Sequence, residues 1–329
     1  MHTELIVPGL FARPPGARLP GLELLLARSR STAHEARSTE AALYELFDLE
    51  DEPVAAGALT YIAAERAAGD ASWLRADPVH LRLMRDRLIV MPAEAIGVSA
   101  SEARTLCDAL NTHFAGKLVL DPVYPTRWCA RTASEAVLNM NSALDVAGRE
   151  VNLSQSADKR VHALVNEAQM LLYAHPVNEA REARGDLPVN SLWLWGAGAA
   201  PQKAQARWQS VTAADPLVLG LARAAGLRRR LPKPARAWLD RVPEEGRHLV
   251  LLDTLRAPAA LGDADGLSAM LQALEEAWFA PVLAALRAGR VGMVTVHVPD
   301  ATPALSVEAI RGDLRRIWRR RRPLSAWIG

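Results

Sequence analysis

The segment from Val189 to Gly198, VNSLWLWGAG, limits most narrowly what this chain can fold into. Its apolar run, Leu192–Trp195, is typical of a buried strand in an α/β sheet. The run ends abruptly in a Gly-Ala-Gly turn, as at the carboxyl edge of such a sheet, where ligands bind. Gly196 and Gly198 permit a close backbone approach or a positive φ angle. The segment therefore predicts a central strand, Val189–Trp195, followed by a ligand-facing turn.

Strand and helix patterns alternate on both sides of this segment, which predicts a three-layer α/β core. Within the longest helical pattern, Glu275 and Glu276 are expected to face water. The strands are expected at Glu4–Val7, His248–Asp253 and Val291–Val298, and the helices at Gly21–Arg30, Pro216–Ala225, Leu267–Gly289 and Val307–Arg322.

Residues 70–187 have a different pattern. Short alternating runs surround Pro78, and Ser99 with Glu102 three positions later forms the signature of a capped helix start. This stretch predicts a mixed α+β domain inserted into the core. The predicted core is therefore made from residues 1–69 and 188–329, and the inserted domain from residues 70–187.

Composition indicates a packed globular protein. Of the 329 residues, 50% are hydrophobic and 23% are charged, with a formal net charge of +2 that requires neither a nucleic-acid nor a membrane partner. The two cysteines, Cys107 and Cys129, exclude a disulfide scaffold and favour a reducing compartment. Neither a basic leader nor an apolar run of about 18 residues is visible, so we expect a soluble, cytoplasmic protein.

Several segments match one known family in the same order along the chain. These are ELIVPGLFARP, WLRADPVHL, VSASEARTLCDALN, the tripeptide Thr126-Arg127-Trp128, VNSLWLWGAG and HVPDATPAL. Together they resemble the archaeal-type cofactor-independent phosphoglycerate mutases of the alkaline-phosphatase-like metalloenzyme superfamily. Within that superfamily the chain looks like a degenerate bacterial branch, sometimes labelled regulatory proteins of the RpfE type. The resemblance implies an alkaline-phosphatase-like α/β core with an inserted domain.

The chain departs from the family where that family holds its two metal ions. Pro8 stands in place of the first metal-binding Asp, and proline offers no side-chain donor to a cation. The region DEPVAAGALT lacks the phosphorylated Ser, and Pro299-Asp300 replaces an Asp-His pair. The segment after Asp253 supplies Asp263 and Asp265 but no His. We therefore expect no metal cofactor and a loss of metal-dependent phosphoryl transfer.

The arginine positions of the family are retained. Arg75 and Arg127 match positions that meet the phosphate and carboxylate of the substrate, a task suited to a planar and permanently charged guanidinium. His175 precedes the glycine turn in a polar stretch with Asn178 and Arg181. The predicted ligand-binding residues are thus Arg75, Arg127, His175, Gly196 and Gly198, with ordinary surface arginines and a solvated helix end as the alternatives.

Two functions from different classes remain open. The first is a phosphoglycerate-mutase-like binding or regulatory protein for a small phosphorylated metabolite. The second is a phosphatase or mutase with a rebuilt site, whose catalytic candidates are Asp253, His297 and Asp300 and whose Mn²⁺, Mg²⁺ or Zn²⁺ ligands include Asp263 and Asp265. The arginine-rich C-terminal segment, residues 315–322, is a candidate surface for a protein partner, with a solvated helix end as the alternative.

Overall fold

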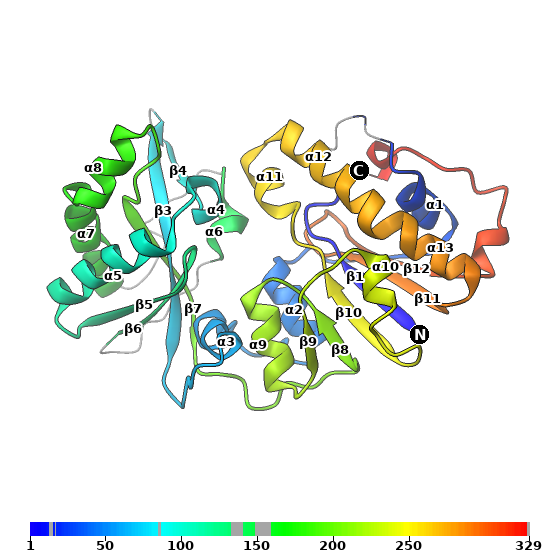
Figure 1. Cartoon of the computed structure of the whole chain (residues 1–329), viewed down its shortest axis with the longest axis horizontal. Coiled ribbons are helices and arrows are strands. Elements are labelled where there is room, and N and C mark those ends of the chain that lie inside the picture. Colours follow the sequence, from blue (N-terminus) through cyan, green and yellow to red (C-terminus); the bar gives the residue numbers. More distant parts are fainter. Residues whose placement is uncertain (13–15, 17, 85–86, 133–140, 149–158, 328–329) are drawn as a thin grey trace. The chain divides into compact units, whose positions relative to one another are not determined.

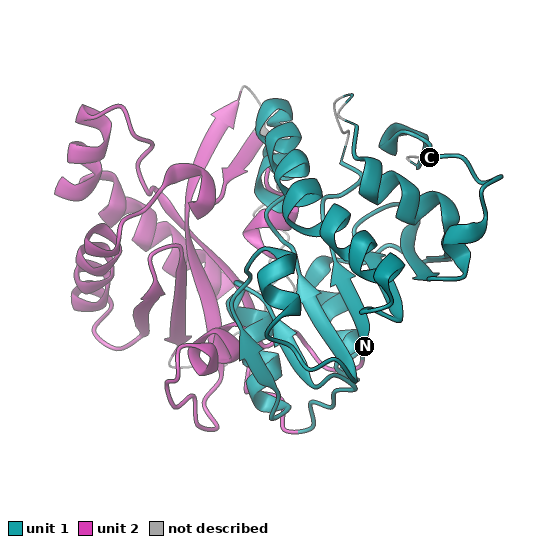
Figure 2. Cartoon of the chain, turned by 45° about the vertical axis from the view of Figure 1, so that its right-hand side comes forward, with its two compact units in different colours: residues 1–50, 203–329 teal, residues 51–202 magenta. Residues whose placement is uncertain are grey.

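The chain folds into two units, each with its own sheet (Figure 1). The computed structural model describes all residues except 13–15, 17, 85–86, 133–140, 149–158 and 328–329. The core unit comprises Met1–Glu50 and Lys203–Gly329, and the inserted unit comprises Asp51–Gln202 (Figure 2). An inserted α+β unit within an α/β core is the architecture that the sequence indicates, although the observed insert is longer than residues 70–187 at both ends.

The core unit contains a seven-stranded sheet in the order β2-β12-β11-β1-β10-β8-β9. The five strands from β11 to β9 run parallel, and β12 and β2 are antiparallel additions at one side. The strands are β1 (His2–Ile6), β2 (Arg30–His34), β8 (Ser210–Thr212), β9 (Arg228–Arg230), β10 (Arg247–Leu251), β11 (Met293–Val298) and β12 (Ala304–Ile310).

One face of this sheet carries the apolar core. Leu5, Val250, Val294 and Val296 pack there against a layer of helices. The opposite face carries Glu4 together with the buried Ile6 and Leu249, because residues alternate between the two faces of a strand. The helical layer consists of α1 (Pro20–Arg28), α10 (Ala235–Leu239), α12 (Ala264–Leu274) and α13 (Ala280–Ala288), with a π-helical turn, Glu275–Phe279, between the last two.

The stretch Ala264–Ala288 is long and apolar enough to cross a membrane by length and composition. Its residues Leu267, Leu271 and Val282 are buried against the sheet and the neighbouring helices of the core unit. A π-helical turn interrupts its hydrogen-bond ladder, and Glu275 lies in that turn. This stretch is therefore packed within the core unit.

Three further helices of the core unit border the carboxyl ends of the strands or the connections between them. They are α2 (Thr39–Leu46), α9 (Pro216–Ala224) and α11 (Arg256–Leu261). The predicted helix Val307–Arg322 is wrong. Val307 and Ala309 are buried and alternate with the more exposed Glu308 and Ile310, so this stretch pairs with β11 as strand β12. A short 3₁₀ turn, Asp313–Arg315, follows it.

The inserted unit is built on a five-stranded sheet in the order β4-β3-β6-β5, in which β3 also pairs with β7. The strands are β3 (Trp73–Met84), β4 (Arg87–Met91), β5 (Leu118–Tyr124), β6 (Arg127–Thr132) and β7 (Ser191–Gly198). The described helices are α3 (Ala56–Ala63), α4 (Ala93–Ile96), α5 (Ala100–Phe114), α6 (Ala143–Val146), α7 (Lys159–Tyr173) and α8 (Pro176–Ala183).

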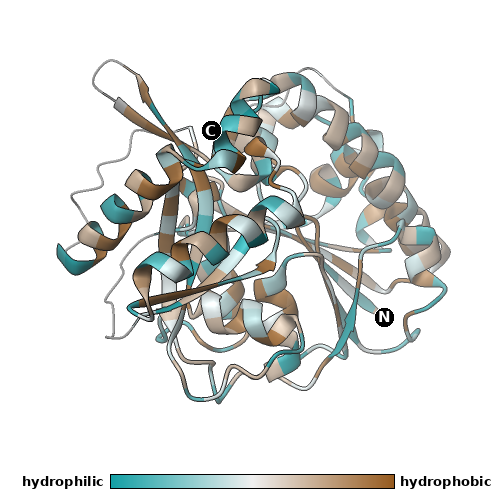
Figure 3. Ribbon diagram, turned by 60° about the vertical axis from the view of Figure 1, so that its left-hand side comes forward, coloured by the Kyte–Doolittle hydropathy of each residue, from teal (hydrophilic) through white to brown (hydrophobic). Residues whose placement is uncertain are grey.

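The amphipathic pattern of these helices accounts for the inserted unit's core. Helices of the chain carry both hydrophobic and hydrophilic residues (Figure 3), and in α5 the buried residues recur at helical spacing, as in Ala103, Leu106, Cys107 and Leu110. The predicted capped start of α5 is confirmed, since Ser99 accepts from the Glu102 amide and the Glu102 carboxylate accepts from the Ser99 amide. Cys107 and Cys129 are buried and free.

The predicted strand at the start of VNSLWLWGAG exists, but its place in the core sheet is wrong. Residues Ser191–Gly198 form β7, which pairs antiparallel with β3 inside the inserted unit. Its apolar run is buried on both faces, against α7 on one side and α3 on the other. Such two-sided burial explains why the segment has the composition of a central α/β strand.

Candidate functional site

The carboxyl ends of β1 and β11 meet at one edge of the core sheet. Pro8-Gly9 follows β1 and Pro299-Asp300 follows β11. The Gly9 amide donates to Asp300 Oδ2 over 2.8 Å, and a Cβ at Gly9, whose φ is +80°, would lie 3.1 Å from the Leu255 backbone. Burial raises the pKa of Asp300 above its usual range, which the Gly9 hydrogen bond opposes. This carboxyl group therefore ties two loops together.

A buried ion pair lies beside Asp300. Arg256, the first residue of α11, donates through Nη2 to Glu40 Oε1 over 2.9 Å, and both side chains are 9% exposed. Arg256 and Glu40 act on the pKa of Asp300 in opposite directions, so the three charges share one neighbourhood. The Arg37 amide also donates to the Pro299 carbonyl over 3.3 Å, which holds the start of α2 at this edge.

Sequence reasoning missed the contribution of α2 to this edge. Ser38 caps α2 by accepting from the Ala41 amide, and Thr39 Oγ1 is enclosed with no described group within hydrogen-bond distance. The signal was present, because Ser-Thr-Glu before the apolar run of α2 is a typical helix start. The pairing of Glu40 with Arg256, 216 positions away, carries no local signal.

The three aspartates that follow β10 do not converge on Asp300 in the way a metal site requires. Asp253 is half-buried directly after β10, and its carbonyl accepts from the Arg256 amide over 3.1 Å. Asp263 caps α12 by accepting from the Gly266 amide over 2.9 Å, and Asp265 lies exposed in the first turn of that helix. Asp263 and Asp265 therefore belong to a helix start.

His297 lies on β11 and takes part in a polar cluster around Glu4, on the same face of the core sheet. Its Nδ1 is 2.9 Å from Ser306 Oγ, and its Nε2 is 3.5 Å from Glu4 Oε2. Arg247 donates to Glu4 Oε1 through Nε and Nη2, at 3.0 and 2.7 Å. His2 Nδ1 lies 3.8 Å from Glu4 Oε1, and Arg207 Nη2 lies 3.8 Å from Glu4 Oε2. His297 thus serves a buried carboxylate rather than the loop of Asp300.

Because the pKa of Glu4 is shifted, the contribution of this cluster to stability should depend on pH. Burial of Glu4 by itself raises its pKa, but the close contact with His297 and the hydrogen bonds from Arg247 outweigh burial and hold the pKa at about 2, against an ordinary 4.5. A carboxyl group whose pKa is depressed on folding stabilises the protein above its unfolded pKa and loses that contribution as the pH falls toward the folded pKa.

We expect Glu4→Gln to lower the free energy of unfolding at pH 7 and to reduce its dependence on pH below 4.5. The difference in free energy of unfolding between the natural chain and the variant should shrink as the pH falls from 5 toward 3. The decrease should be at most about 1.4 kcal/mol per pH unit. Urea unfolding across this pH range measures the effect. A difference between the two proteins that stays constant with pH would contradict the role given to Glu4.

Arg75 is buried within the inserted unit and fully engaged there. Its guanidinium meets Asp77 Oδ1 through Nε at 2.9 Å and through Nη2 at 2.5 Å, with Thr60 Oγ1 at 3.3 Å from Nη1. The Trp195 indole donates to the other oxygen of Asp77 over 2.7 Å, and its ring lies 5.3 Å from the guanidinium carbon of Arg75. The charge of Arg75 is therefore used to hold β3, β7 and α3 together.

The other predicted ligand residues of the inserted unit are also engaged locally. Arg127 forms an ion pair with Glu94 and contacts Thr126, and its side chain is partly exposed. His175 caps α8, where Nδ1 accepts from the Val177 amide over 3.2 Å, and burial lowers the pKa of its imidazole. Arg75 and Arg127 share electrostatic influence on Asp77, whereas His175 belongs to another end of the unit.

The glycine turn after β7 packs against the start of α3. Gly196 has a φ of +59°, and a Cβ there would come within 2.6 Å of the Ala56 side chain. A Cβ on Gly198 would lie 3.0 Å from the Ala55 side chain. Close approach between a strand end and a helix is thus sufficient to explain both glycines.

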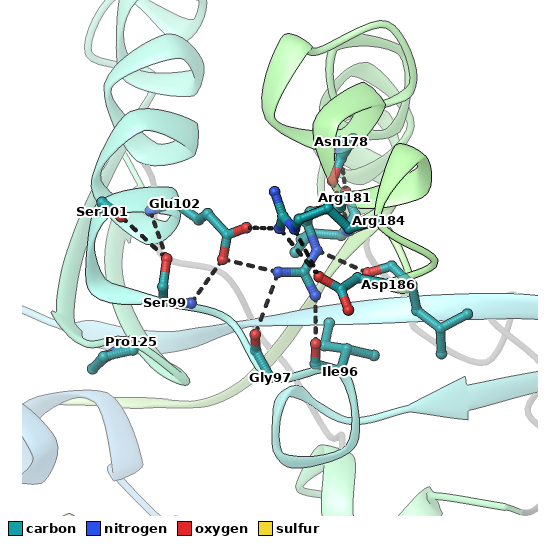
Figure 4. A network of polar contacts seen from close by, with 12 residues as sticks. Ile96, Gly97, Ser99, Ser101, Glu102, Pro125, Asn178, Arg181, Arg184 and Asp186 are labelled. Carbon is teal, nitrogen blue, oxygen red and sulfur yellow. Dashed lines mark hydrogen bonds and ion pairs between the residues drawn. The ribbon is translucent and has the colours of Figure 1, made fainter.

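A polar network joins α5 to α8 (Figure 4). Arg181 is buried and donates to Glu102 Oε2 at 2.9 Å, to the Leu187 carbonyl at 2.9 Å, and to the carbonyls of Gly97 and Ile96. Arg184 donates to the other oxygen of Glu102 over 2.9 Å. Every one of these contacts is internal to the inserted unit, so the polar stretch before VNSLWLW holds α8 against the start of α5.

The donor set at these places does not fit two divalent ions. Within the described parts of the chain, no group of three or more His, Cys, Asp and Glu side chains gathers closely enough to hold a metal ion. Pro8 contributes no donor, Asp300 is hydrogen-bonded to Gly9, and Glu40 is paired with Arg256. Two-metal phosphoryl transfer needs several free carboxylate or imidazole ligands around ions about 3.5–4 Å apart.

The curated proteins that are similar in sequence are described as 2,3-bisphosphoglycerate-independent phosphoglycerate mutases. The chain is 31% identical over 133 residues to a probable 2,3-bisphosphoglycerate-independent phosphoglycerate mutase of Geobacter sulfurreducens, covering 36% of this chain and 33% of that protein. It is 28% identical over 156 residues to 2,3-bisphosphoglycerate-independent phosphoglycerate mutase 2 of Methanothermobacter thermautotrophicus, covering 44% and 38%. The matches thus span little more than a third of these relatives' length. No protein-family model matches the chain.

The fold is similar to a solved structure over nearly the whole chain. The PH0037 protein from Pyrococcus horikoshii superposes with a TM-score of 0.56 at 16% identity, covering 94% of this chain and 87% of that one. This likeness and the arrangement of the two sheets confirm the fold class that the sequence predicts, an α/β core with an inserted α+β unit.

Proposed function

Because this chain is a distant relative of the 2,3-bisphosphoglycerate-independent phosphoglycerate mutases, we propose that it retains their fold but acts as a binding or regulatory protein. Its ligand would be a small phosphorylated metabolite. Metal-dependent phosphoryl transfer would have been lost, and the protein would act in the cytoplasm of a bacterium, with no divalent cofactor.

The observation that supports this proposal most strongly is the Gly9–Asp300 contact beside the Arg256–Glu40 pair. In an open α/β sheet, the carboxyl edge is where reacting groups gather. Here that edge carries a proline, a buried carboxyl group with a raised pKa, and a neutralised carboxylate. Such a set favours a closed structural junction over a cation site.

The competing proposal is a phosphatase or mutase with a rebuilt site. One observation favours it, namely that Asp300, Glu40 and Arg256 lie together at the carboxyl edge, beside the enclosed hydroxyl of Thr39. Under this alternative, metal would displace Arg256 from Glu40 and the Gly9 amide from Asp300. Its expected signature is tight binding of Mn²⁺, Mg²⁺ or Zn²⁺ together with phosphoryl transfer.

The ligand half of the proposal can be tested at Arg127. The melting temperature of the full chain is measured with and without 3-phosphoglycerate and other phosphate esters, for the natural protein and for Arg127→Ala. We expect a phosphate ester to raise the melting temperature of the natural protein and not of the variant, because a charge-assisted contact of Arg127 to phosphate contributes about 1.5–3 kcal/mol.

Arg127 is the suitable position because its side chain is partly exposed, whereas Arg75 is buried in an ion pair and its removal would disturb the fold. Arg104→Ala, on the exposed side of α5, is a matched control that removes one arginine from the same unit. The proposal for Arg127 fails if no phosphate ester shifts the natural protein, or if Arg127→Ala and Arg104→Ala respond alike.

A further inference from the structure

A groove of about 500 Å³ lies in the core unit between α1 and α13. Leu24 and Arg28 of α1 line one wall, and Ala280, Leu283 and Arg287 of α13 line the other. Residues three and four apart share one face of a helix, so both walls are continuous helix faces. The groove combines an apolar wall, Leu24 with Ala280 and Leu283, and two guanidinium groups. Its volume lies within the range of small-molecule sites.

The C-terminal segment supplies a third cation. Arg321 lines the same groove, although it lies beyond the last strand of the core sheet. The segment is held to the core unit by Leu324, which is buried, and by Arg319, which donates to the Ser29 carbonyl over 2.7 Å. The favourable interaction of a cation with the C-terminal end of a helix can explain Arg28 and Arg287. It does not explain Arg321.

The groove's one carboxylate leaves these cations uncompensated. Glu275 accepts from the amides of Gly21 and Leu22 at 2.6 and 3.1 Å, so its charge is directed at the first turn of α1. Arg321 also acts on the buried Glu23, which is already paired with Arg18 at 2.8 Å.

Arg28 has an unused donor. Its Nη1 donates to the Leu314 carbonyl, but its Nε is enclosed and meets no described acceptor. Because this Nε is enclosed, Arg28 can contact a molecule in the groove only through its terminal guanidinium nitrogens.

From the groove's shape and charge we infer that it binds a small phosphorylated molecule with an apolar or aromatic body. The phosphate would lie among the guanidinium groups of Arg28, Arg287 and Arg321. A guanidinium group can donate two parallel hydrogen bonds to two phosphate oxygens. The apolar body would lie on Leu24 and Leu283. This site belongs to the core unit and is separate from Arg127 of the inserted unit, so it goes beyond the proposed function.

Calorimetric titration of the full chain with 1-naphthyl phosphate tests the inference, with inorganic phosphate and 1-naphthol as probes that lack one part each. We expect one site per chain for 1-naphthyl phosphate and at least tenfold weaker binding of each partial probe. The double variant Arg287→Gln with Arg321→Gln should weaken binding of 1-naphthyl phosphate at least tenfold, with little change in melting temperature, because both side chains are exposed.

The matched control is Arg315→Gln with Arg320→Gln, which removes the same charge from exposed arginines that do not line the groove. This control should bind 1-naphthyl phosphate as the natural chain does. Arg127→Ala should also bind it normally, so that a failure of the groove and a failure of the proposed function can be told apart. The inference is overturned if 1-naphthyl phosphate does not bind, if inorganic phosphate binds equally well, or if the control loses as much affinity as the groove variant.

Discussion

Replacing Arg75 with methionine lowers the free energy of unfolding of the inserted unit by about 3–5 kcal/mol, the cost typical of breaking a buried ion pair. Arg75 and Asp77 are 2% and 5% exposed, so the substitution leaves the Asp77 carboxylate in a poorly solvated environment. Burial already raises the pKa of Asp77, and Arg75 is the main charge that opposes this rise. In the variant, Asp77 should take up a proton well above its ordinary pKa.

Hydrogen–deuterium exchange of β3 and β7 in the full chain measures the loss for the inserted unit separately from the core unit. The double variant Arg75→Met with Asp77→Leu is the decisive control, since replacing both partners of a buried pair with apolar groups of similar size is often close to neutral. We expect it to recover more than half of the lost protection. Equal losses in the single and double variants would contradict the account of this pair.

The second large effect is expected at Arg181. Arg181→Met removes the donors that satisfy Glu102 and the carbonyls of Leu187, Gly97 and Ile96 (Figure 4). Burial raises the pKa of Glu102, but the Ser99 cap and the charge of Arg181 hold it at about 2. We expect a loss of about 3–5 kcal/mol, because the half-buried Glu102 carboxylate and three carbonyls lose a buried charged donor at once.

Arg184→Met is the matched control for Arg181, because it removes a contact to the same carboxylate from a side chain that is 53% exposed. An exposed ion pair contributes about 0–1 kcal/mol, so urea unfolding of the full chain should separate the two variants clearly. A loss for Arg184→Met as large as that for Arg181→Met would show that burial does not set the strength of this network.

Helices and strands could be predicted from the sequence where a few neighbouring residues determine them. The capped start of α5 follows from Ser99 and Glu102, and the strand at Ser191–Gly198 follows from its apolar run. The partner of that strand could not be predicted in the same way. A run buried on both faces fits a parallel core strand and a central antiparallel strand equally, and β7 pairs with β3 across more than a hundred residues.

Polar contacts between residues distant in sequence leave no local pattern. The expectation that Glu275 faces water is wrong, because Glu275 is buried and accepts from the first turn of α1 across 254 residues. The contact of His297, a catalytic candidate, with Glu4 on the neighbouring strand is of the same kind. Arg75 is an instructive exception, since Asp77 lies two positions away on the same face of β3 and the spacing alone could have predicted their pairing.

The most direct test of the central claim, a phosphoglycerate-mutase-like fold without a two-metal site, is metal content measured together with activity. The purified full chain is equilibrated with Mn²⁺, freed of unbound ions, and analysed for Mn, Mg and Zn by mass spectrometry. The same sample is then assayed for interconversion of 3-phosphoglycerate and 2-phosphoglycerate. We predict no stoichiometric divalent metal and no activity above that of Asp300→Ala. Two tightly bound ions per chain with Mn²⁺-dependent mutase activity that Asp300→Ala abolishes would contradict the account.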